Sequence, residues 1–390
     1  MKCIQSRRRF IIQASAAALG ITGTPLLSSS GQSPSNLSSL KTDVPIEKIA
    51  ETLAATLPAL MSEQNVPGLG VALIREGAVA WTGSFGVKSV VSGEPVDKET
   101  IFDAASLAKP VFATAVMKLV EEGEIDLDRP LGLYLDQPFI EEVEQHERLN
   151  RVTARNVLSH TTGFPNWRRG KLLKFIRDPG KRWGYSGEGF AYLKRVIQSV
   201  TRQPTSDFVR EQVLQPLGMK RTEAKWTNAA EGRAAEAHSA KGESLGAPET
   251  STDNTALSLW TTPGEYARFM TLFMDPLRSE RSILKPATIE KMLKPQIEIK
   301  ERAVVGKIAW GLGWGLQHSA EGEVFWHWGD NTGFKAFCIG YPDSGLGAAI
   351  FSNGELGWKV HRKALPPALG GEQTALMWKG SWRAPRASNL

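Results

Sequence analysis

Strand-like segments stand at both ends of this 390-residue chain, and helix-like segments fill its middle. Two runs near the beginning, 68–74 and 78–87, are separated by Arg-Glu-Gly, which favours a hairpin. Further strand-like runs lie near the end of the chain, at 308–316, 324–328, 334–341 and 346–352. Helical patterns dominate between about residues 106 and 250. We therefore expect an α/β (α+β) fold: an antiparallel sheet built from the N- and C-terminal segments, flanked by helices, with an inserted, mostly helical lobe.

A serine and a lysine three residues apart open the first helical pattern of that lobe. Ser106 and Lys109 begin a stretch with apolar residues at helical spacing, which Gly123 closes. Three-residue spacing places the hydroxyl and the amine on one helix face, and a helix N-terminus favours negative charge that develops nearby. The S-x-x-K pattern recurs at 38–41 and 282–285, but neither copy lies in a regular helical pattern. The copy at Ser106 is therefore the one that suits a nucleophile and its base.

Two more motifs follow in order, Tyr-Ser-Gly at 185–187 and His-Trp-Gly at 327–329. An isolated Tyr or His is more often a packed core residue than a functional one, but the order and context of the three motifs favour a functional interpretation. Tryptophans near the motifs are treated as core side chains first, because aromatic residues fill cores more often than ligand sites. These are Trp167, Trp183, Trp260, Trp314, Trp326 and Trp328.

The three motifs together resemble the serine β-lactamase and penicillin-binding-protein superfamily, and in particular its class C-like branch with esterases and D-amino-acid peptidases. Other segments are similar to the same branch: 158–165 (L-S-H-T-T-G-F-P), 215–219 (Q-P-L-G-M), 261–263 (T-T-P) and 352–355 (S-N-G-E). The likeness extends from about residue 46 to about residue 365. It implies a β-lactamase/transpeptidase-like fold with the site between the sheet and the helical lobe.

The resemblance also implies roles for single residues. It makes Ser106 the nucleophile, Lys109 its base partner and Tyr185 a second proton-transfer group. It places His327 and Gly329 on the strand that lines the substrate pocket. The oxyanion donors it implies are the backbone N–H groups of Ser106 and of Asp330, which follows the third motif. Losing one such donor raises a hydrolase's barrier by about 3 to 4 kcal/mol.

Two departures from the superfamily pattern bear on the substrate. The second motif usually reads Y-x-N, and Gly187 stands where the Asn amide would steady the lysine and bind the acyl-amide of a β-lactam. Glu188 is a candidate to compensate. The third motif reads K-T-G in many β-lactamases, whereas His327 has an ordinary pKa of about 6.5 and is mostly neutral at pH 7. Both departures favour an esterase, amidase or peptidase over efficient β-lactam hydrolysis.

Lys109 accepts the proton of Ser106 only when it is itself neutral. The ordinary pKa values of Lys and Tyr are about 10.4 and 10, so neither is a base at pH 7 unless its surroundings lower that pKa. Buried lysines are known with a pKa of about 5 to 6. We therefore expect Lys109 to be almost wholly buried and close to Tyr185.

A competing nucleophile motif, Gly-Glu-Ser-Leu-Gly at 242–246, matches the G-x-S-x-G elbow of α/β-hydrolases. That elbow requires a hydrophobic strand before Ser244 and a helix after it, and the flanking sequences fit neither. We interpret it as a loop without catalytic function.

The first 30 residues resemble a twin-arginine export signal, with arginines at 7–9, then an aromatic and an aliphatic residue and a moderately apolar run. That run is too polar for a comfortable membrane span. We expect a signal peptide (1–30), a flexible lead-in (31–45), a β-lactamase-like serine hydrolase domain (46–370) and a tail (371–390). The protein would be periplasmic or otherwise exported, with no stable membrane span after signal removal.

Composition excludes several other functions. The formal net charge is +6, but residues 1–30 hold four of these charges and no acidic residue, so nucleic-acid binding has no support. The six histidines show no metal-binding spacing, and no nucleotide motif is present, so we expect no metal and no cofactor. A basic stretch, 168–182, is more simply a solvated face than a site for an anionic envelope polymer.

The sequence thus predicts an exported serine hydrolase that forms an acyl-enzyme on Ser106 and hydrolyses esters or small amides. One alternative is a β-lactamase or a penicillin-binding D,D-peptidase, whose substrates would be β-lactams or cell-wall peptides. An alternative of another class is a non-catalytic envelope binding or sensor protein with the same fold. Intact Ser106, Lys109 and Tyr185 argue against it, since a binder does not need all three.

Overall fold

The computed structural model describes residues 39–140, 146–168, 171–226, 230, 232–247, 259–274, 282–301, 304 and 306–381. The predicted signal peptide and most of the predicted lead-in lie outside the described residues, as do Arg169 of the basic stretch and the end of the chain from residue 382.

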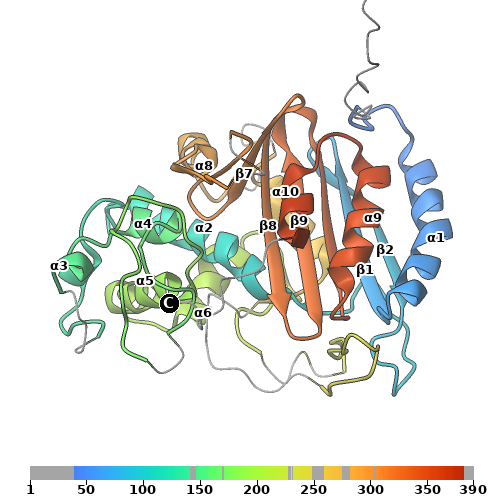
Figure 1. The fold of residues 1–390 in the computed structure, drawn as a ribbon, viewed down its shortest axis with the longest axis horizontal. Helices are drawn as coiled ribbons and strands as arrows, with labels where there is room; N and C mark the ends of the chain where they lie inside the picture. The colour runs from blue at the N-terminus through green and yellow to red at the C-terminus, as the bar shows by residue number, and fades with distance from the viewer. Residues whose placement is uncertain are drawn as a thin grey trace, which may run out of the picture. The chain divides into compact units, whose positions relative to one another are not determined.

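An antiparallel sheet of eight strands is the centre of the fold, and it unites the two ends of the chain (Figure 1). Its order is β2-β1-β10-β9-β8-β7-β6-β5. The strands are β1 (Gly68–Arg75), β2 (Ala78–Gly86), β5 (Ile297–Glu298), β6 (Ile308–Trp310), β7 (Gly315–Ser319), β8 (Gly322–Asn331), β9 (Phe334–Tyr341) and β10 (Leu346–Ser352). β1 pairs with β10, with Leu69 opposite Ser352, so the first hairpin is bound to the last strand. The α/β fold class expected from the sequence is confirmed.

Helices cover both faces of this sheet. One face carries α1 (Ile46–Glu63), α9 (Gly357–Leu369) and α10 (Thr374–Ser381), whose buried side chains share a core with Phe337 and Ile339 of β9. The other face carries α2 (Ala108–Glu121), α7 (Pro263–Thr271) and α8 (Pro286–Leu293), which pack against alternate residues of the same strand. The two-residue period of a strand sends successive side chains into different cores, which explains why β9 is buried along its whole length.

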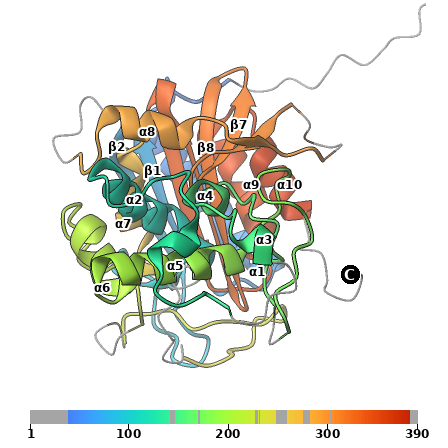
Figure 2. The ribbon, with the colours of Figure 1, turned by 90° about the vertical axis from the view of Figure 1, so that its left-hand side faces the viewer.

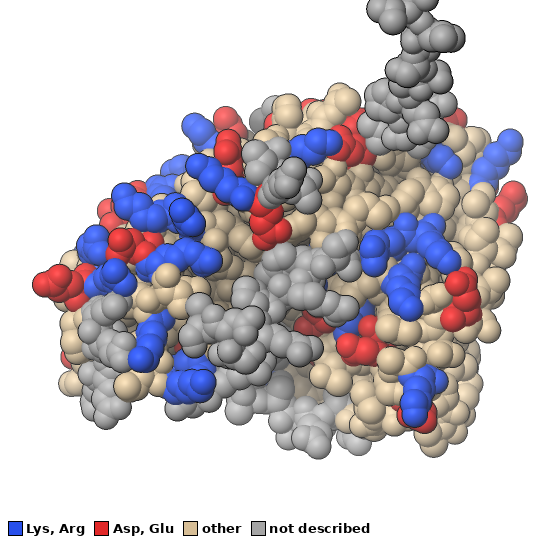
Figure 3. Space-filling view, viewed as in Figure 1, with Lys and Arg blue, Asp and Glu red and all other residues tan. Residues whose placement is uncertain are grey.

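The helical lobe is inserted between two short strands, β3 (Phe102–Asp103) and β4 (Trp260–Thr261), which pair and close its base. Figure 2 shows α5 and α6 of this lobe in front of the sheet. Besides α2, the lobe contains α3 (His146–Leu149), α4 (Ala154–Leu158), α5 (Gly187–Thr201), α6 (Thr205–Val209) and a π-helical turn (Arg210–Leu214). On the face drawn in Figure 3, Lys and Arg side chains on the lobe are interspersed with Asp and Glu.

The end of the described chain is folded rather than extended. Residues 374–381, which we expected to belong to a tail, form α10, and Leu376 and Trp378 of this helix are buried. Trp378 contacts the rings of Trp183 and Trp326, each at a centroid distance of 5.8 Å. The sheet, α10 and the segment before α5 therefore meet in one aromatic cluster. Among the described residues, no helix has the length and apolar character needed to cross a membrane.

Candidate active site

Ser106 and Lys109 lie together at the junction between the sheet and the helical lobe. Ser106 is in a 3-10 turn (Ala105–Leu107) that leads directly into α2, and Lys109 is in the first turn of that helix. Lys109 Nζ donates a hydrogen bond to Ser106 Oγ at 3.0 Å. Ser106 is 6% exposed, and Lys109 is fully buried. The expected burial of Lys109 is thus confirmed, and its amine has the position that a base for Ser106 requires.

Burial changes the protonation of Lys109. Loss of hydration lowers its pKa from 10.5 to about 7, because a charged amine is disfavoured inside the protein. Nζ lies 4.9 Å from the ring centre of Tyr185 and 5.5 Å from that of Phe190, so aromatic faces surround it. A substantial fraction of Lys109 is therefore neutral at pH 7.

Tyr185 lies two residues before α5, and its ring packs 4.6 Å from that of Trp328. Burial raises the pKa of its phenol above the ordinary value of 10, although a hydrogen bond with Ser106 acts in the opposite direction. The side chain is thus a neutral phenol at pH 7, with a proton to donate. Since Lys109 is the group with the lowered pKa, it is the better proton acceptor of the two.

His160 belongs to the same cluster, and sequence reasoning did not select it as a site residue. Its ring lies 4.2 Å from that of Tyr185, and its Nδ1 accepts the backbone N–H of Ser186 at 3.1 Å. Burial, with Lys109 and His327 nearby, lowers its pKa well below 6.5. A neutral imidazole that accepts at Nδ1 carries its proton on Nε2. The only sequence signal for this residue was its place in the L-S-H-T-T-G-F-P segment.

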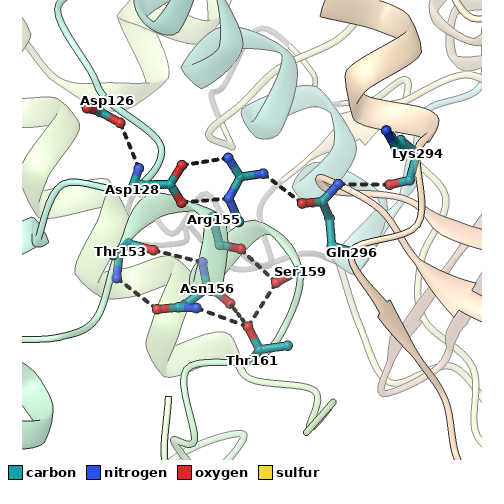
Figure 4. A network of polar contacts seen from close by, with 9 residues as sticks. All are labelled: Asp126, Asp128, Thr153, Arg155, Asn156, Ser159, Thr161, Lys294 and Gln296. Carbon is teal, nitrogen blue, oxygen red and sulfur yellow. Dashed lines mark hydrogen bonds and ion pairs between the residues drawn. The ribbon is translucent and has the colours of Figure 1, made fainter. Parts of the chain in front are cut away.

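A polar network fixes the turn around His160 (Figure 4). Its φ of +54° is unfavourable for a side chain of this size, so the neighbours must hold it. Ser159 Oγ lies 2.9 Å from Thr161 Oγ1 and donates to the carbonyl of Arg155 at 2.7 Å. The Arg155 guanidinium binds both carboxylate oxygens of Asp128 at 2.7 Å and Gln296 at 2.7 Å. The turn is thereby connected to the residues just before β5.

His327 lies on β8 with its ring 6.3 Å from that of Tyr185. It is fully buried, and burial together with the nearby Lys109 lowers its pKa well below 6.5. The first position of the third motif is therefore a neutral imidazole, as the sequence predicted, and it supplies no cation for a substrate carboxylate.

Gly329 lets β8 approach the turn that carries Ser106. A Cβ atom at this position would lie 2.1 Å from the carbonyl oxygen of Ala104, which is backbone and cannot swing away. β8 pairs with β7 only over residues 322–326, whereas its pairing with β9 extends to Asn331. Beyond residue 326, the edge of β8 therefore faces the Ser106 turn instead of another strand.

Asp103 joins that turn to β8. Its Oδ1 accepts the N–H of Ala105 at 2.7 Å, and its Oδ2 accepts from Asn331 Nδ2 at 2.8 Å. Ala105 has a φ of +48°, a conformation that side chains other than Gly rarely adopt. Burial raises the pKa of Asp103 to about 6, although both hydrogen bonds act against the rise. The carboxylate thus stabilises a strained backbone next to Ser106 and binds it to the third-motif strand.

Asp330, the residue after the third motif, is held by two lysines. Its carboxylate lies 3.2 Å from Lys335 Nζ and 3.0 Å from Lys379 Nζ, and both ammonium groups are nearly buried. These contacts lower its pKa against the opposing effect of burial. Its side chain is thus tied to β9 and α10.

The second motif differs from its usual pattern in a way that the structure explains. Gly187 is the first residue of α5, and Trp167 lies directly against it. The Glu188 carboxylate accepts the N–H of Arg168 at 2.9 Å and lies 3.5 Å from its guanidinium. Glu188 is therefore engaged by Arg168, and the hypothesis that it compensates for the missing Asn gains no support.

Ser244 lies away from this arrangement. Its hydroxyl donates to Glu236 at 2.6 Å within a loop between two glycines with positive φ, Gly242 and Gly246. Within the described residues 232–247, no strand precedes Ser244 and no helix follows it, although a hydrolase elbow requires both. Within the described part of the chain, no group of three His, Cys, Asp or Glu side chains is arranged to hold a metal ion.

Residues 53–368 match the model of the Beta-lactamase family. The chain belongs to this β-lactamase family. Members of the superfamily with this fold are serine hydrolases. Penicillin-binding protein 4 of Amycolatopsis lactamdurans is 27% identical over 328 residues, which cover 76% of this chain and 83% of that protein. Protein flp of Staphylococcus aureus strain MW2 is 24% identical over 314 residues, covering 75% of this chain and 61% of that protein.

Solved structures show the same β-lactamase fold. The D-alanine carboxypeptidase AmpC from Burkholderia cenocepacia superimposes with a TM-score of 0.70 at 18% identity, covering 83% of this chain and 99% of that one. The octameric penicillin-binding protein homologue from Pyrococcus abyssi gives a TM-score of 0.68 at 22% identity, covering 83% and 77% of the two chains. α10 lies beyond the part of the chain that the family model matches.

Proposed function

We propose that this chain is a serine hydrolase that forms an acyl-enzyme on Ser106 and hydrolyses esters or small amides. The observation that carries the proposal is the contact of 3.0 Å between Lys109 Nζ and Ser106 Oγ, made by a fully buried lysine. With its pKa lowered to about 7, a substantial fraction of the amine is neutral at the pH where most enzymes work. A serine without such a base is a poor nucleophile.

In the first half of the reaction, neutral Lys109 takes the proton of Ser106 as Oγ bonds to the substrate carbonyl carbon. The backbone N–H groups of Ser106 and Asp330 stabilise the negative charge on the carbonyl oxygen. When the tetrahedral intermediate collapses, the bond to the leaving alcohol or amine breaks. Tyr185 donates its phenolic proton to the leaving group and regains one from the Lys109 ammonium.

In the second half, a water molecule replaces the leaving group. It attacks the acyl carbon and gives a proton to the same Lys109 and Tyr185 pair. The bond between the acyl carbon and Ser106 Oγ then breaks, and Oγ recovers a proton. The products are a carboxylic acid and the free enzyme, so atoms and protons balance over the cycle.

The neutral His327 and the missing Asn at Gly187 support esters and small amides as substrates. A carboxylate on the substrate would find no cation at the first position of the third motif. A D,D-peptidase or β-lactamase activity is the second candidate, because relatives bear the names penicillin-binding protein and D-alanine carboxypeptidase. A non-catalytic binding protein is the third, and the lowered pKa of Lys109 argues against it.

Export is a further part of the proposal. It rests on the consecutive arginines at 7–9 and the moderately apolar run behind them. We propose that the hydrolase domain acts outside the cytoplasm, in the periplasm or beyond. Fusion of residues 1–30 to a reporter that is active only after export tests this step, with the arginines at 7 and 8 replaced by lysines as the control.

Turnover of p-nitrophenyl butyrate and nitrocefin by the purified enzyme and its Ser106→Ala variant tests the function. Ester turnover with little nitrocefin turnover, both lost in the variant, supports the proposal. Comparable or faster nitrocefin turnover makes the protein a β-lactamase instead. Ester turnover that survives Ser106→Ala contradicts the assignment of the nucleophile, and inactivity on both substrates favours a narrower peptidase or a binding protein. Mass spectrometry of the quenched reaction locates the acyl group.

A further inference from the structure

A short segment before the second motif is fastened to the start of α5. Residues 165–168 and 186–188 are joined by hydrogen bonds from both main chain and side chains. These are Ser186 Oγ to the Pro165 carbonyl (2.8 Å), Gly187 N–H to Asn166 O (3.0 Å) and Oδ1 (3.0 Å), Glu188 N–H to Asn166 O (3.0 Å), and Arg168 N–H to Glu188 Oε1 (2.9 Å). Trp167 lies in the middle of this segment, so its backbone has a fixed position relative to α5.

The indole of Trp167 fills the space that a side chain at position 187 would occupy. A Cβ atom built on Gly187 would lie 2.1, 2.2 and 2.6 Å from three atoms of the indole, Cζ2, Cη2 and Cε2. Gly187 does not have a positive φ, so its backbone is compatible with any L-residue. The nearest obstacle to a side chain here is therefore the Trp167 indole.

Trp167 is restrained through its packing and through the backbone on either side of it. It is half-buried and packs against the apolar core of the helical lobe. The hydrogen bonds of Asn166 and Arg168 hold the residues on both sides of it. Gly187 and Trp167 thus form a matched pair, in which the absence of one side chain makes room for the other.

We propose that Trp167 is a specificity-determining residue, which puts an apolar wall in the place of the usual amide of the second motif. This inference rests on the proposed function and narrows it. The preferred substrates are then esters of simple apolar carboxylic acids. Acyl groups that carry an acylamino substituent, as β-lactams and cell-wall peptides do, meet the indole with their amide N–H and C=O unpaired. Each buried polar group without a partner lowers kcat/KM by about tenfold.

Two p-nitrophenyl esters that differ in the acylamino group test the proposal, the butyrate and the N-acetylalanine ester. Their kcat/KM ratio is measured for the wild type, Trp167→Ala, Gly187→Asn and the double variant. Wild type prefers the butyrate. The double variant has room for the Asn amide, and its ratio shifts toward N-acetylalanine by about tenfold or more. A folded double variant that hydrolyses the butyrate with an unchanged ratio overturns the proposal.

Thermal unfolding provides a readout that does not depend on turnover. In the wild-type background, Gly187→Ala lowers Tm by about 2 °C or more, because its Cβ meets the indole. In the Trp167→Ala background, the same substitution has no such effect. Equal shifts in both backgrounds overturn the proposal. Gly264→Ala is the control, since Gly264 is also in the first turn of a helix but its Cβ would lie 3.4 Å from the nearest side chain. If Ser106 is not acylated, the proposed function is wrong, but this test of the packing between Trp167 and position 187 still applies.

Discussion

Lys379 Nζ lies 3.0 Å from Asp330 Oδ2, which joins α10 to the residue that follows His-Trp-Gly. The same ammonium lies 5.3 Å from the ring centre of Trp328 and 4.9 Å from that of Trp358. Lys379 is outside the residues that match the family model, whereas Asp330 is the proposed oxyanion donor. The end of the chain therefore contributes a contact that orients the third-motif strand.

We expect Lys379→Met to lower the free energy of unfolding by about 1 to 3 kcal/mol, less than for a fully buried pair, because Asp330 is 40% exposed and keeps Lys335. In this variant, kcat should fall by a larger factor than KM changes. The reason is that Lys379 orients Asp330, whose backbone N–H acts on the transition state as an oxyanion donor. Lys379→Arg restores part of the loss. Chemical denaturation and ester kinetics measure both effects.

Lys363→Met is the matched control for that substitution. Lys363 pairs with Glu63 at 3.2 Å on the same face of the sheet, but both side chains are more than half exposed. Exposed pairs contribute about 0 to 1 kcal/mol, so we expect little change in stability or kcat. Equal effects of the two substitutions would show that the contact with Asp330 has no special role.

The activity of the enzyme should follow the deprotonation of Lys109. Since its pKa is lowered to about 7, we expect kcat/KM for an ester to rise with pH through about 7 and then level off. An ordinary lysine would give a rise only above pH 9 or so. A pH profile of p-nitrophenyl butyrate hydrolysis, corrected for spontaneous hydrolysis, distinguishes the two. A rise centred near pH 10 would contradict Lys109 as a neutral base.

The same lowered pKa makes stability depend on pH. Between pH 7 and 10.5, Lys109 binds a proton in the unfolded chain but not in the native protein. Stability therefore rises with pH across this window, and the penalty for burying the amine is greatest below pH 7. We expect Lys109→Met to remove this contribution. The free energy of unfolding of the variant minus that of the wild type should therefore decrease as pH rises from 7 to 10.5. A constant difference would contradict the burial of a neutral lysine.

Gly329 provides a steric test of how close β8 lies to the Ser106 turn. We expect Gly329→Ala to lower the free energy of unfolding by about 1 to 3 kcal/mol and to reduce ester turnover, because its Cβ would lie 2.1 Å from the Ala104 carbonyl oxygen. Gly132→Ala is the control, since its Cβ would lie 3.5 Å from the nearest atom. Thermal unfolding and acylation rates measure both variants. A Gly329→Ala enzyme with wild-type stability would contradict the close approach.

The sequence predicted those features that depend on local spacing or on the order of the motifs. Ser106 and Lys109 are three residues apart on one helical turn, so local geometry alone brings them together, and burial of Lys109 followed from the chemistry it must perform. Strand patterns at both ends of the chain sufficed to predict one sheet. The catalytic roles of these residues remain predictions.

Other contacts depend on tertiary packing that no local pattern encodes. Asp103 and Asn331 are 228 positions apart and meet only because β8 lies against the Ser106 turn. The sequence predicts Trp167 as a core residue, and only the folded chain brings its indole into the space that a side chain at position 187 would occupy. α10 was missed because a short helix close to the end of a chain resembles a tail until its aromatic contacts are known.

His160 should prove necessary for the position of Tyr185. We expect His160→Phe, which keeps a ring beside Tyr185, to lower the free energy of unfolding by about 1 to 3 kcal/mol, because the buried N–H of Ser186 loses its acceptor. The kcat should fall together with the stability, since the hydrogen bond between His160 Nδ1 and the Ser186 N–H holds the segment that carries Tyr185. His318→Phe is the control, because His318 lies on β7 with 72% of its side chain exposed. Denaturation and ester kinetics compare the two, and a His160→Phe enzyme with unchanged kcat would show that Tyr185 is positioned by other contacts.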